Sequence, residues 1–493
     1  MTPDHEVVIV GAGFGGMGAA IQFKRMGVSD LLIVEREDDL GGTWHVNRYP
    51  GLAVDIASVT YSYSFEPNPY WSRLFAPGDE LKRYADHVAD KYDLRRHMRF
   101  STVVEGARWD EEGQVWVLSV SGEPPIITRY LVTATGFLSQ PHTPDIPGID
   151  GFAGRVMHTT AWDDSVDLTG RRAAVIGTGA TAVQLIPELA RTVDELTVYQ
   201  RTPIWVVPKI DGPIPAAVQK LFARLPVTQK LARLANTGLL ELVMIGGVLR
   251  FRQARALNRA AAAVARRHLR RQVADPELRR KLTPDYDFGC KRPTFSNTYF
   301  RAFTKPHVHL QTSGIERIEP DGIVAGDGSK AEIDTLVLAT GFDLWDVNFP
   351  AIEVIGRGGR NLGTWWRQTR FQAFEGIAVP EFPNFLTLAS PYSYSGLSYF
   401  TTIETHMRHI RRLFGELRRR GARTFEVTHE ANDEFLQRVT AKLNDSVFYL
   451  GSCATSRSYY FNQHGEAAIL RPTSTISARR EADSYSLDAY TYA

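Results

Sequence analysis

One pattern near the start of the chain constrains its fold more than any other feature. A short apolar run, Val7–Val10, leads into the glycine-rich turn Gly11–Gly16, and helix-forming residues follow to about Arg25. A second apolar run, Leu31–Val34, then ends at Glu35. Continuous apolar runs are typical of strands that are covered on both faces, as in parallel sheets. The pattern therefore predicts a strand–turn–helix–strand unit within a parallel sheet.

The same pattern occurs again in the middle of the chain. Ala173–Ile176 is expected to form a strand, Gly177–Ala182 a turn, the residues to about Ala190 a helix, and Leu196–Tyr199 a second strand that leads to Arg201. The first glycine and the residue that closes the unit are 24 positions apart in both copies. Two equivalent units predict an α/β protein with two Rossmann-like dinucleotide-binding domains.

The first unit has the residues that a flavin or nicotinamide dinucleotide needs. Gly11 allows a tight turn, Gly13 lets the backbone approach a pyrophosphate, and Gly16 lets the helix pack against the strand. Glu35 can accept hydrogen bonds from both ribose hydroxyls, and its charge repels a 2′-phosphate. The first site is therefore predicted to hold FAD or NAD.

The second unit differs where the ribose is recognised. Its turn contains Gly177, Thr178, Gly179 and Thr181, and Ala182 replaces the third glycine, which is a tolerated variant. Its second strand leads to Arg201 and Thr202 instead of an acid. Because an arginine forms charge-assisted, bidentate hydrogen bonds with phosphate, this corner suits a 2′-phosphate. We expect NADPH here.

These units divide the chain into alternating segments. The strands Leu131–Thr133 and Leu336–Leu338 each precede Ala-Thr-Gly and are expected where the chain crosses between domains. We predict an FAD-binding domain from residues 1–145 and 343–493, an NADP-binding domain from 146–212 and 281–342, and a helical insert at 213–280. The insert has ten arginines between Arg250 and Arg280, which predict either a solvated basic face or a surface that contacts membrane or guides a lipophilic substrate.

Composition excludes several classes of function. Lys and Arg number 57 against 55 Asp and Glu, and this balance argues against a nucleic-acid partner. The only cysteines, Cys290 and Cys453, argue against a disulfide framework and a metal site and suit a reducing compartment. No basic leader is visible, and the most apolar run, Leu239–Leu249, is too short to span a bilayer. A cytoplasmic protein without a transmembrane segment is expected.

An FAD site and an NADPH site leave three options: a disulfide reductase, another flavin reductase or a monooxygenase. A disulfide reductase needs a cysteine pair beside the flavin, and the two cysteines are 163 residues apart. Two further motifs favour a monooxygenase. Gly41–Asp55 fits the pattern GGxWxxxxYPGxxxD, and Phe152–Asp163 fits FxGxxxHxxxW(P/D). With both motifs in this order, the chain resembles the type I Baeyer–Villiger monooxygenases over about residues 5–470.

The resemblance implies roles for particular residues. Arg292, in Lys291-Arg292-Pro293, would stand over the flavin as a permanent cation, and Asp55 would pair with it. Lys291 would join the 2′-phosphate site. The other flavin contacts that the resemblance implies are Phe14, Thr43, Trp44, Tyr61 and, through its backbone, Val104.

Two features of the motifs leave alternatives open. His158, inside the shorter motif, is expected to be a linker histidine that positions the two domains, with direct acid–base chemistry as the alternative. The C-terminal stretch Cys453–His464 lacks the tryptophan that covers the nicotinamide in many relatives. Tyr459, Tyr460 or Phe461 would line the substrate site there or serve packing alone.

The implied reaction uses NADPH to reduce FAD, O2 to form a C4a-peroxyflavin, and this species to convert a lipophilic ketone or aldehyde into an ester or lactone. The sister group of N- and S-oxygenating flavoproteins is the nearest alternative, and it usually has an aromatic residue other than tryptophan at position 162. A non-catalytic redox sensor is the alternative from another class. The sequence does not fix the oligomeric state.

Overall fold

The computed structural model describes all residues, 1–493. Its first sheet has the strand order β17-β4-β5-β6-β1-β2-β3, and β18 pairs with the second half of β6. The first glycine unit supplies β1 and β2, which are parallel, with Val7 opposite Leu31. The strands are β1 (His5–Val10), β2 (Leu31–Val34), β3 (Met98–Arg99), β4 (Val104–Asp110), β5 (Val115–Val120), β6 (Ile126–Thr133), β17 (Glu353–Ile355) and β18 (Phe385–Thr387).

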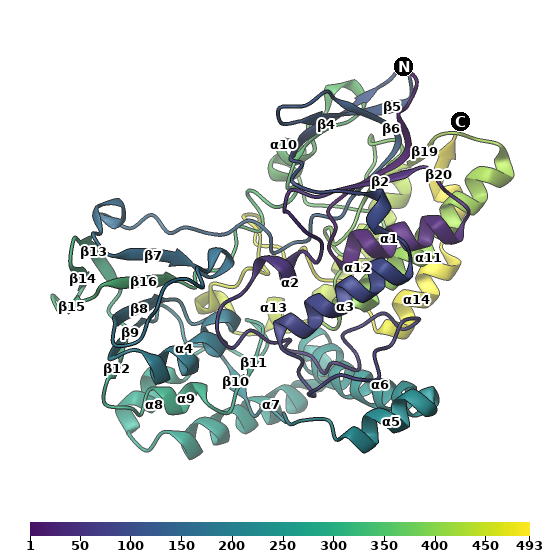
Figure 1. Ribbon diagram of the computed structural model, residues 1–493. Helices are drawn as coiled ribbons and strands as arrows, with labels where there is room; N and C mark the ends of the chain where they lie inside the picture. The colour runs from purple at the N-terminus through teal and green to yellow at the C-terminus, as the bar shows by residue number, and fades with distance from the viewer.

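Helices from both ends of the chain cover this first sheet (Figure 1). Helix α1 follows the glycine turn and packs along α11, so the start of the chain and its last hundred residues share one apolar core. The residues after Ser474, which have no clear periodicity, form α14 and β20, and β20 pairs antiparallel with β19. The elements are α1 (Phe14–Arg25), α2 (Thr43–Val46), α3 (Gly78–Lys91), α10 (Leu362–Gln368), α11 (Tyr399–Arg420), α12 (His429–Leu443), α13 (Val447–Leu450), α14 (Thr475–Ser484), β19 (Phe425–Val427) and β20 (Tyr490–Tyr492).

The second sheet is fully parallel, with the strand order β12-β9-β8-β16-β7. Helix α4 begins at the second glycine turn and packs in a separate apolar core with α9. The predicted α/β architecture with two sheets is confirmed, although the first sheet is mixed, because β5 pairs antiparallel with both β4 and β6. The elements are β7 (Arg155–His158), β8 (Arg172–Ile176), β9 (Glu195–Tyr199), β12 (Val308–Gln311), β16 (Thr335–Leu338), α4 (Ala180–Thr192) and α9 (Tyr299–Ala302), with the small antiparallel sheet β13 (Ile315–Glu319), β14 (Gly322–Ala325) and β15 (Lys330–Glu332).

The helical insert lies along the bottom of Figure 1, below both sheets. It comprises α5 (Ala216–Arg224), α6 (Pro226–Glu241), the π-helical η4 (Leu242–Leu249), α7 (Phe251–Gln272) and α8 (Pro276–Leu282). The strands β10 (Val206–Val207) and β11 (Thr294–Phe295) form a parallel pair beside the insert, and β10 contacts α7. Short 3-10 turns are η1 (Arg95–His97), η2 (Ile149–Gly151), η3 (Thr159–Ala161), η5 (Arg357–Gly359), η6 (Ala454–Ser456) and η7 (Leu487–Ala489).

The apolar run of the insert belongs to a longer helix than the sequence suggested. The apolar run judged too short for a bilayer is the end of a helix that continues from α6 into η4, because the junction residue Leu242 keeps helical angles of φ −57° and ψ −45°. The combined helix Pro226–Leu249 has 24 residues and is long and apolar enough to cross a membrane. Length and composition alone are weak evidence, because buried core helices meet the same criterion; in this helix only 17% of the most apolar window is buried.

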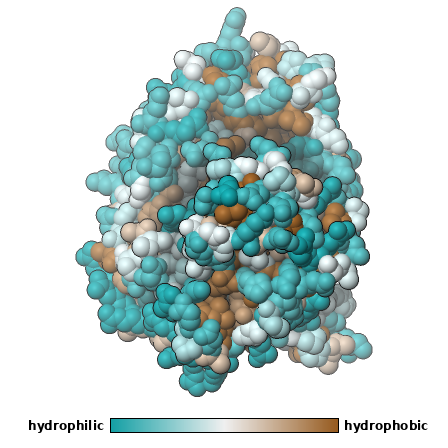
Figure 2. Space-filling view, turned by 90° about the vertical axis from the view of Figure 1, so that its left-hand side faces the viewer, coloured by the Kyte–Doolittle hydropathy of each residue, from teal (hydrophilic) through white to brown (hydrophobic).

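The outer surface beside the second sheet is mainly hydrophilic, as Figure 2 shows. Apolar residues on this face gather in a recess in its upper part and in a second group in its lower centre.

Candidate active site

The first glycine turn shows a different requirement at each glycine. Gly11 has φ +110°, and a Cβ there would lie 2.6 Å from the carbonyl oxygen of Ala134. A Cβ at Gly16 would collide with the carbonyl oxygen of Gly11. Gly13 has an ordinary φ of −74°, and a Cβ there would meet only Gly42, at 3.7 Å. The protein's own atoms therefore require glycine at positions 11 and 16, whereas position 13 leaves space in front of helix α1.

The same turn provides a cradle that suits a dinucleotide. No side chain caps the N-terminus of α1, so its first N–H groups are available to an anion. Glu35 is 7% exposed, and its carboxylate accepts hydrogen bonds from the backbone N–H groups of Ala12 at 2.7 Å and Glu37 at 3.1 Å. The residues present thus fit FAD, with phosphate groups at the helix N-terminus and a ribose beside Glu35.

The second glycine turn repeats this geometry at α4. Gly177 has φ +117°, and a Cβ there would collide with the carbonyl oxygen of Ala339. Gly179 has no atom within 4 Å of its Cβ position, and Ala182 is fully buried. No side chain caps α4. The turn is tied to the next strand end, because Thr178 Oγ1 donates a hydrogen bond to the carbonyl oxygen of Thr202 at 2.8 Å.

The residues beside this second cradle are cationic. Arg201 and Lys291 come from segments 90 positions apart in sequence, and the charge of Arg201 acts on Lys291. Burial first, and then the charge of Arg201, lowers the pKa of Lys291 to about 8. Neither side chain has a carboxylate partner, in contrast to the acid at the first cradle. This corner fits the 2′-phosphate of NADPH.

The predicted pair of Arg292 and Asp55 is in contact. Arg292 Nε donates to Asp55 Oδ2 at 2.8 Å, and Nη2 donates to Asp55 Oδ1 at 3.2 Å. Nη1 donates to the hydroxyl of Tyr394 at 2.9 Å, and this hydroxyl donates to the carbonyl oxygen of Leu397 at 2.7 Å. Burial alone would lower the pKa of Arg292, but the charge of Asp55 outweighs it and raises this pKa well above its ordinary range. The guanidinium is thus a fixed, permanent cation.

The longer motif also connects the two nucleotide cradles. Tyr49 OH donates to Gln184 Oε1 at 3.0 Å, and Gln184 Nε2 donates to the carbonyl oxygen of Ala53 at 2.8 Å. Gln184 lies on α4, close to Thr181, so the motif that ends in Asp55 docks on the helix of the second cradle. No sequence signal identified Gln184 or Tyr394.

The remaining predicted flavin contacts do not form one cluster. Trp44 Nε1 donates to Tyr61 OH at 3.2 Å, so these two side chains lie together. Thr43 is exposed at the start of α2. The Phe14 ring lies in the apolar core, 4.7 Å between centroids from Phe400. Val104 begins β4, two residues after Thr102, whose N–H donates to the carbonyl oxygen of Glu35.

His158 lies at the end of β7, outside any helix. Its Nδ1 pairs with Thr160 Oγ1 at 2.8 Å, and burial lowers its pKa. Trp162 follows a 3-10 turn and packs against the core of the second sheet. His158 and Trp162, the two most distinctive residues of the shorter motif, therefore both make contacts with neighbouring residues of the protein.

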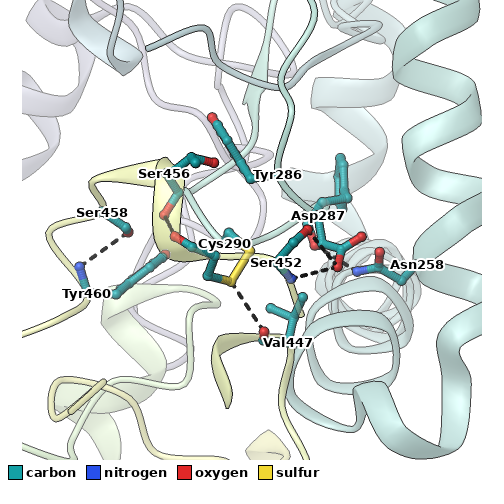
Figure 3. Close-up of a disulfide and its surroundings, with 12 residues drawn as sticks. Asn258, Tyr286, Asp287, Cys290, Val447, Ser452, Ser456, Ser458 and Tyr460 are labelled. Carbon is teal, nitrogen blue, oxygen red and sulfur yellow. Dashed lines mark hydrogen bonds between the residues drawn. A yellow bond between two sulfur atoms is a disulfide. The ribbon is translucent and has the colours of Figure 1, made fainter. Parts of the chain in front are cut away.

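The sequence argued against a disulfide framework, but the structure pairs the two cysteines. Cys290 and Cys453 form a disulfide with their Cα atoms 5.2 Å apart (Figure 3). The separation of 163 residues in sequence concealed this pair, because the C-terminal loop folds back onto the segment that follows the insert. The bond lies directly beside Lys291 and Arg292. The C-terminal loop is fastened again where Trp345 Nε1 donates to the carbonyl oxygen of Tyr459 at 2.8 Å, and Tyr459 and Tyr460 are largely buried.

Two uncapped helix N-termini, with an acid at one and cations at the other, define a class together with the arginine fixed by Asp55: a two-dinucleotide flavoprotein oxidoreductase. A family model described as pyridine nucleotide-disulphide oxidoreductase matches residues 8–230. A Baeyer–Villiger monooxygenase of Streptomyces coelicolor is 38% identical, covering 99% of this chain and 93% of the relative. One of Pseudomonas aeruginosa is 37% identical, covering 98% and 91%.

Solved structures agree with these relatives. OTEMO in complex with FAD and NADP has a TM-score of 0.89 at 27% identity, with 100% of both chains covered. Closed cyclohexanone monooxygenase has a TM-score of 0.87 at 28% identity, with 100% of both covered. Oxidised steroid monooxygenase bound to NADP has a TM-score of 0.86 at 30% identity, with 99% of both covered. The chain belongs to the Baeyer–Villiger monooxygenase family. The predicted family and the two dinucleotide-binding domains are confirmed.

Proposed function

We propose that this chain converts a lipophilic ketone or aldehyde into an ester or lactone. The reaction inserts one oxygen atom of O2 next to the carbonyl, and NADPH supplies the hydride that reduces the other oxygen atom to water. The observation that carries the choice of substrate class is the fixed cation Arg292, hydrogen-bonded to Asp55 and Tyr394. Such a cation has a use where negative charge develops on a carbonyl oxygen.

FAD would be held by the first cradle and would supply the activation of O2 when bound. Gly11, Gly13 and Gly16 shape the turn, the N-terminus of α1 faces the phosphates, and Glu35 is available to a ribose. Around them, the proposed contacts are Phe14, Thr43, Trp44, Tyr61 and the backbone of Val104. The buried position of the Phe14 ring supports a backbone contact at this residue rather than a side-chain contact.

NADPH would be held by the second cradle. The proposed contacts at the glycine turn and beside it are Gly177, Thr178, Gly179, Thr181, Ala182 and Thr202. Arg201 and Lys291 would bind the 2′-phosphate, because both are cations without a carboxylate partner. A phosphate monoester carries between one and two negative charges at neutral pH, so one cation alone would not balance it.

Arg292 would contribute charge and position. Because its pKa is raised, the guanidinium does not lose a proton as negative charge forms on the substrate. Asp55 holds it by two hydrogen bonds and Tyr394 by a third, so its direction is fixed before the substrate arrives. Preorganised donors of this kind cost no rearrangement during the reaction.

A product screen tests the proposal. The FAD-loaded enzyme is given NADPH, O2 and a panel of cyclic ketones, long-chain aldehydes, tertiary amines and sulfides, and products are identified by mass spectrometry with fragmentation. We expect esters or lactones from the carbonyl compounds. N-oxides or sulfoxides alone would establish the sister activity instead and overturn the proposal.

One surface of the insert has the composition of a lipid-binding surface, which suits a lipophilic substrate. Val227, Leu231 and Leu234 are spaced i, i+4 and i+7 on α6, and they are 58%, 60% and 66% exposed. Between residues 212 and 274 there are twelve Lys and Arg but only one acid, Glu241, whose carboxylate is bonded to the backbone of Thr475. We propose that this face rests on an anionic lipid surface, from which a lipophilic ketone is drawn.

Vesicle flotation tests this contact. The enzyme should float with phosphatidylglycerol vesicles and less with phosphatidylcholine vesicles, and L231E/L234E should abolish flotation while NADPH turnover on a water-soluble ketone persists. Flotation that is unchanged in the variant, or absent in the wild type, would exclude the lipid surface. The cytoplasmic location that the sequence predicts stays a prediction.

A further inference from the structure

Three cations gather at the second cradle, although only two of them lie in recognisable motifs. The third is Arg457, which follows the 3-10 turn Ala454–Ser456 in the C-terminal loop. The charge of Arg457 acts on both Arg201 and Lys291. None of the three side chains makes an ion pair or a hydrogen bond with the rest of the protein. Like charges close together repel, so an anion bound among them would stabilise the cluster.

Lys291 is half-buried, whereas Arg201 and Arg457 are exposed, so an anion from solvent can reach the cluster. Partial burial first, and then the charge of Arg457, lowers the pKa of Arg201. Two acids that contact the loop are otherwise engaged: Asp287 accepts hydrogen bonds from Ser452 at 3.0 and 3.3 Å, and Asp285 accepts one from Thr455 at 3.2 Å. No carboxylate of the chain therefore forms an ion pair with Arg201, Lys291 or Arg457.

The loop that carries Arg457 is fastened to the segment that carries Lys291 (Figure 3). The disulfide joins Cys453 to Cys290, the residue immediately before Lys291. Both cysteines are buried, at 6% and 0% exposed. Four residues after the disulfide, Arg457 adopts the left-handed conformation with φ +47°. Residues other than glycine keep this conformation where their surroundings hold them in it.

We propose that Arg457 is the third cation of the 2′-phosphate site and that the Cys290–Cys453 disulfide positions it there. The proposal rests on the proposed NADPH site and adds to it a residue from the far end of the chain. It also makes recognition of the phosphate sensitive to thiols. A dithiol reductant would transfer two electrons and two protons, so the S–S bond breaks, two S–H groups form, and the reductant becomes a disulfide.

Equilibrium binding tests the assignment of Arg457 without turnover. The FAD-loaded enzyme is titrated by calorimetry with adenosine 2′,5′-bisphosphate and, separately, with 5′-AMP, which lacks the 2′-phosphate. Arg457→Ala should bind the bisphosphate about tenfold more weakly and 5′-AMP as well as the wild type does. Arg480→Ala is the matched control, an exposed arginine without an ion pair, and should stay within about twofold of the wild type for both probes.

The disulfide is tested by C290S/C453S, with bound FAD and thermal unfolding as checks of the fold. The variant should lose several-fold in affinity for the bisphosphate and nothing for 5′-AMP, and dithiothreitol should produce the same loss in the wild type but no change in the variant. If both probes weaken equally, the disulfide is a structural brace and its positioning role is refuted.

The outcomes distinguish a failure of the NADPH site from a failure of the Arg457 assignment. If the wild type binds the bisphosphate no better than 5′-AMP, the proposed NADPH site itself fails. If the wild type prefers the bisphosphate and Arg457→Ala keeps that preference, the NADPH site stands and the assignment of Arg457 is wrong.

Discussion

Replacing Arg292 by alanine should separate the consumption of NADPH from the formation of ester. The substitution removes the two hydrogen bonds to Asp55 at 2.8 and 3.2 Å and the one to Tyr394 at 2.9 Å, together with the positive charge. Loss of one preorganised electrostatic contact costs about 2.7–4 kcal/mol in the transition state, or a factor of about 100 to 1,000 in rate. Hydride transfer from NADPH places its negative charge on the flavin and not on the substrate oxygen, so it should persist at a reduced rate.

The fold should tolerate the substitution. The side chains of Arg292 and Asp55 are 19% and 28% exposed, so water reaches the remaining carboxylate. Breaking a fully buried pair costs about 3–5 kcal/mol of unfolding free energy, and this exposure reduces the cost to about 1–3 kcal/mol. Arg292→Lys keeps the charge but cannot reproduce the bidentate contact, so it should lie between the wild type and the alanine variant. Asp55→Asn should reduce ester formation less than Arg292→Ala, because the cation remains.

Stopped-flow absorbance of the flavin follows reduction by NADPH, and mass spectrometry counts ester. In Arg292→Ala, reduction should stay within about tenfold of the wild-type rate, ester should fall by at least about a hundredfold, and hydrogen peroxide should account for the O2 consumed. Ester formation at the wild-type rate in a folded, FAD-loaded Arg292→Ala would refute the role given to this cation.

Three further predictions concern the two cradles. The wild type should prefer NADPH to NADH, and Arg201→Ala should lower kcat/KM for NADPH by about 10- to 100-fold with little change for NADH; equal use of both coenzymes by the wild type would contradict the 2′-phosphate site. Gly13→Val should purify folded, because a Cβ there meets Gly42 only at 3.7 Å, but largely colourless, because the new side chain occupies the space in front of α1. The control Gly151→Ala should purify yellow. A folded, fully yellow Gly13→Val would show that the flavin is not bound at this turn. Because the pKa of Lys291 is lowered to about 8, the free enzyme loses this charge above pH 8, and affinity for adenosine 2′,5′-bisphosphate should fall by up to about tenfold per pH unit there; calorimetry should show no such fall in Lys291→Arg.

The local units of the fold were readable from the sequence because each is built from consecutive residues. The first strand, turn and helix need Gly11 for a positive φ and Gly16 for close packing, and both needs are visible in the spacing of the glycines. The acid at Glu35 and the base at Arg201 likewise follow from where each second strand ends. Such features depend on short-range geometry, so they appear in the sequence.

Contacts that depend on long-range folding were not readable. Tyr394 reaches Arg292 from a serine-rich segment without periodicity, and Gln184 is one polar residue among many on its helix. The disulfide joins residues 163 positions apart, and composition pointed away from it. Arg457 looks like an isolated loop arginine until the fold brings it to Lys291. The pairing of Arg292 with Asp55 was anticipated only because the chain resembles a known family.

Oxygen labelling tests the central claim most directly. A ketone that is converted in the product screen is incubated with the FAD-loaded enzyme, NADPH and 18O2 in unlabelled water, and the ester is fragmented in the mass spectrometer. The account predicts one labelled oxygen for each ester, located in the single-bonded position, with an unlabelled carbonyl oxygen and one NADPH consumed for each label. An ester without the label, or a labelled product in which the ketone is intact, would contradict it.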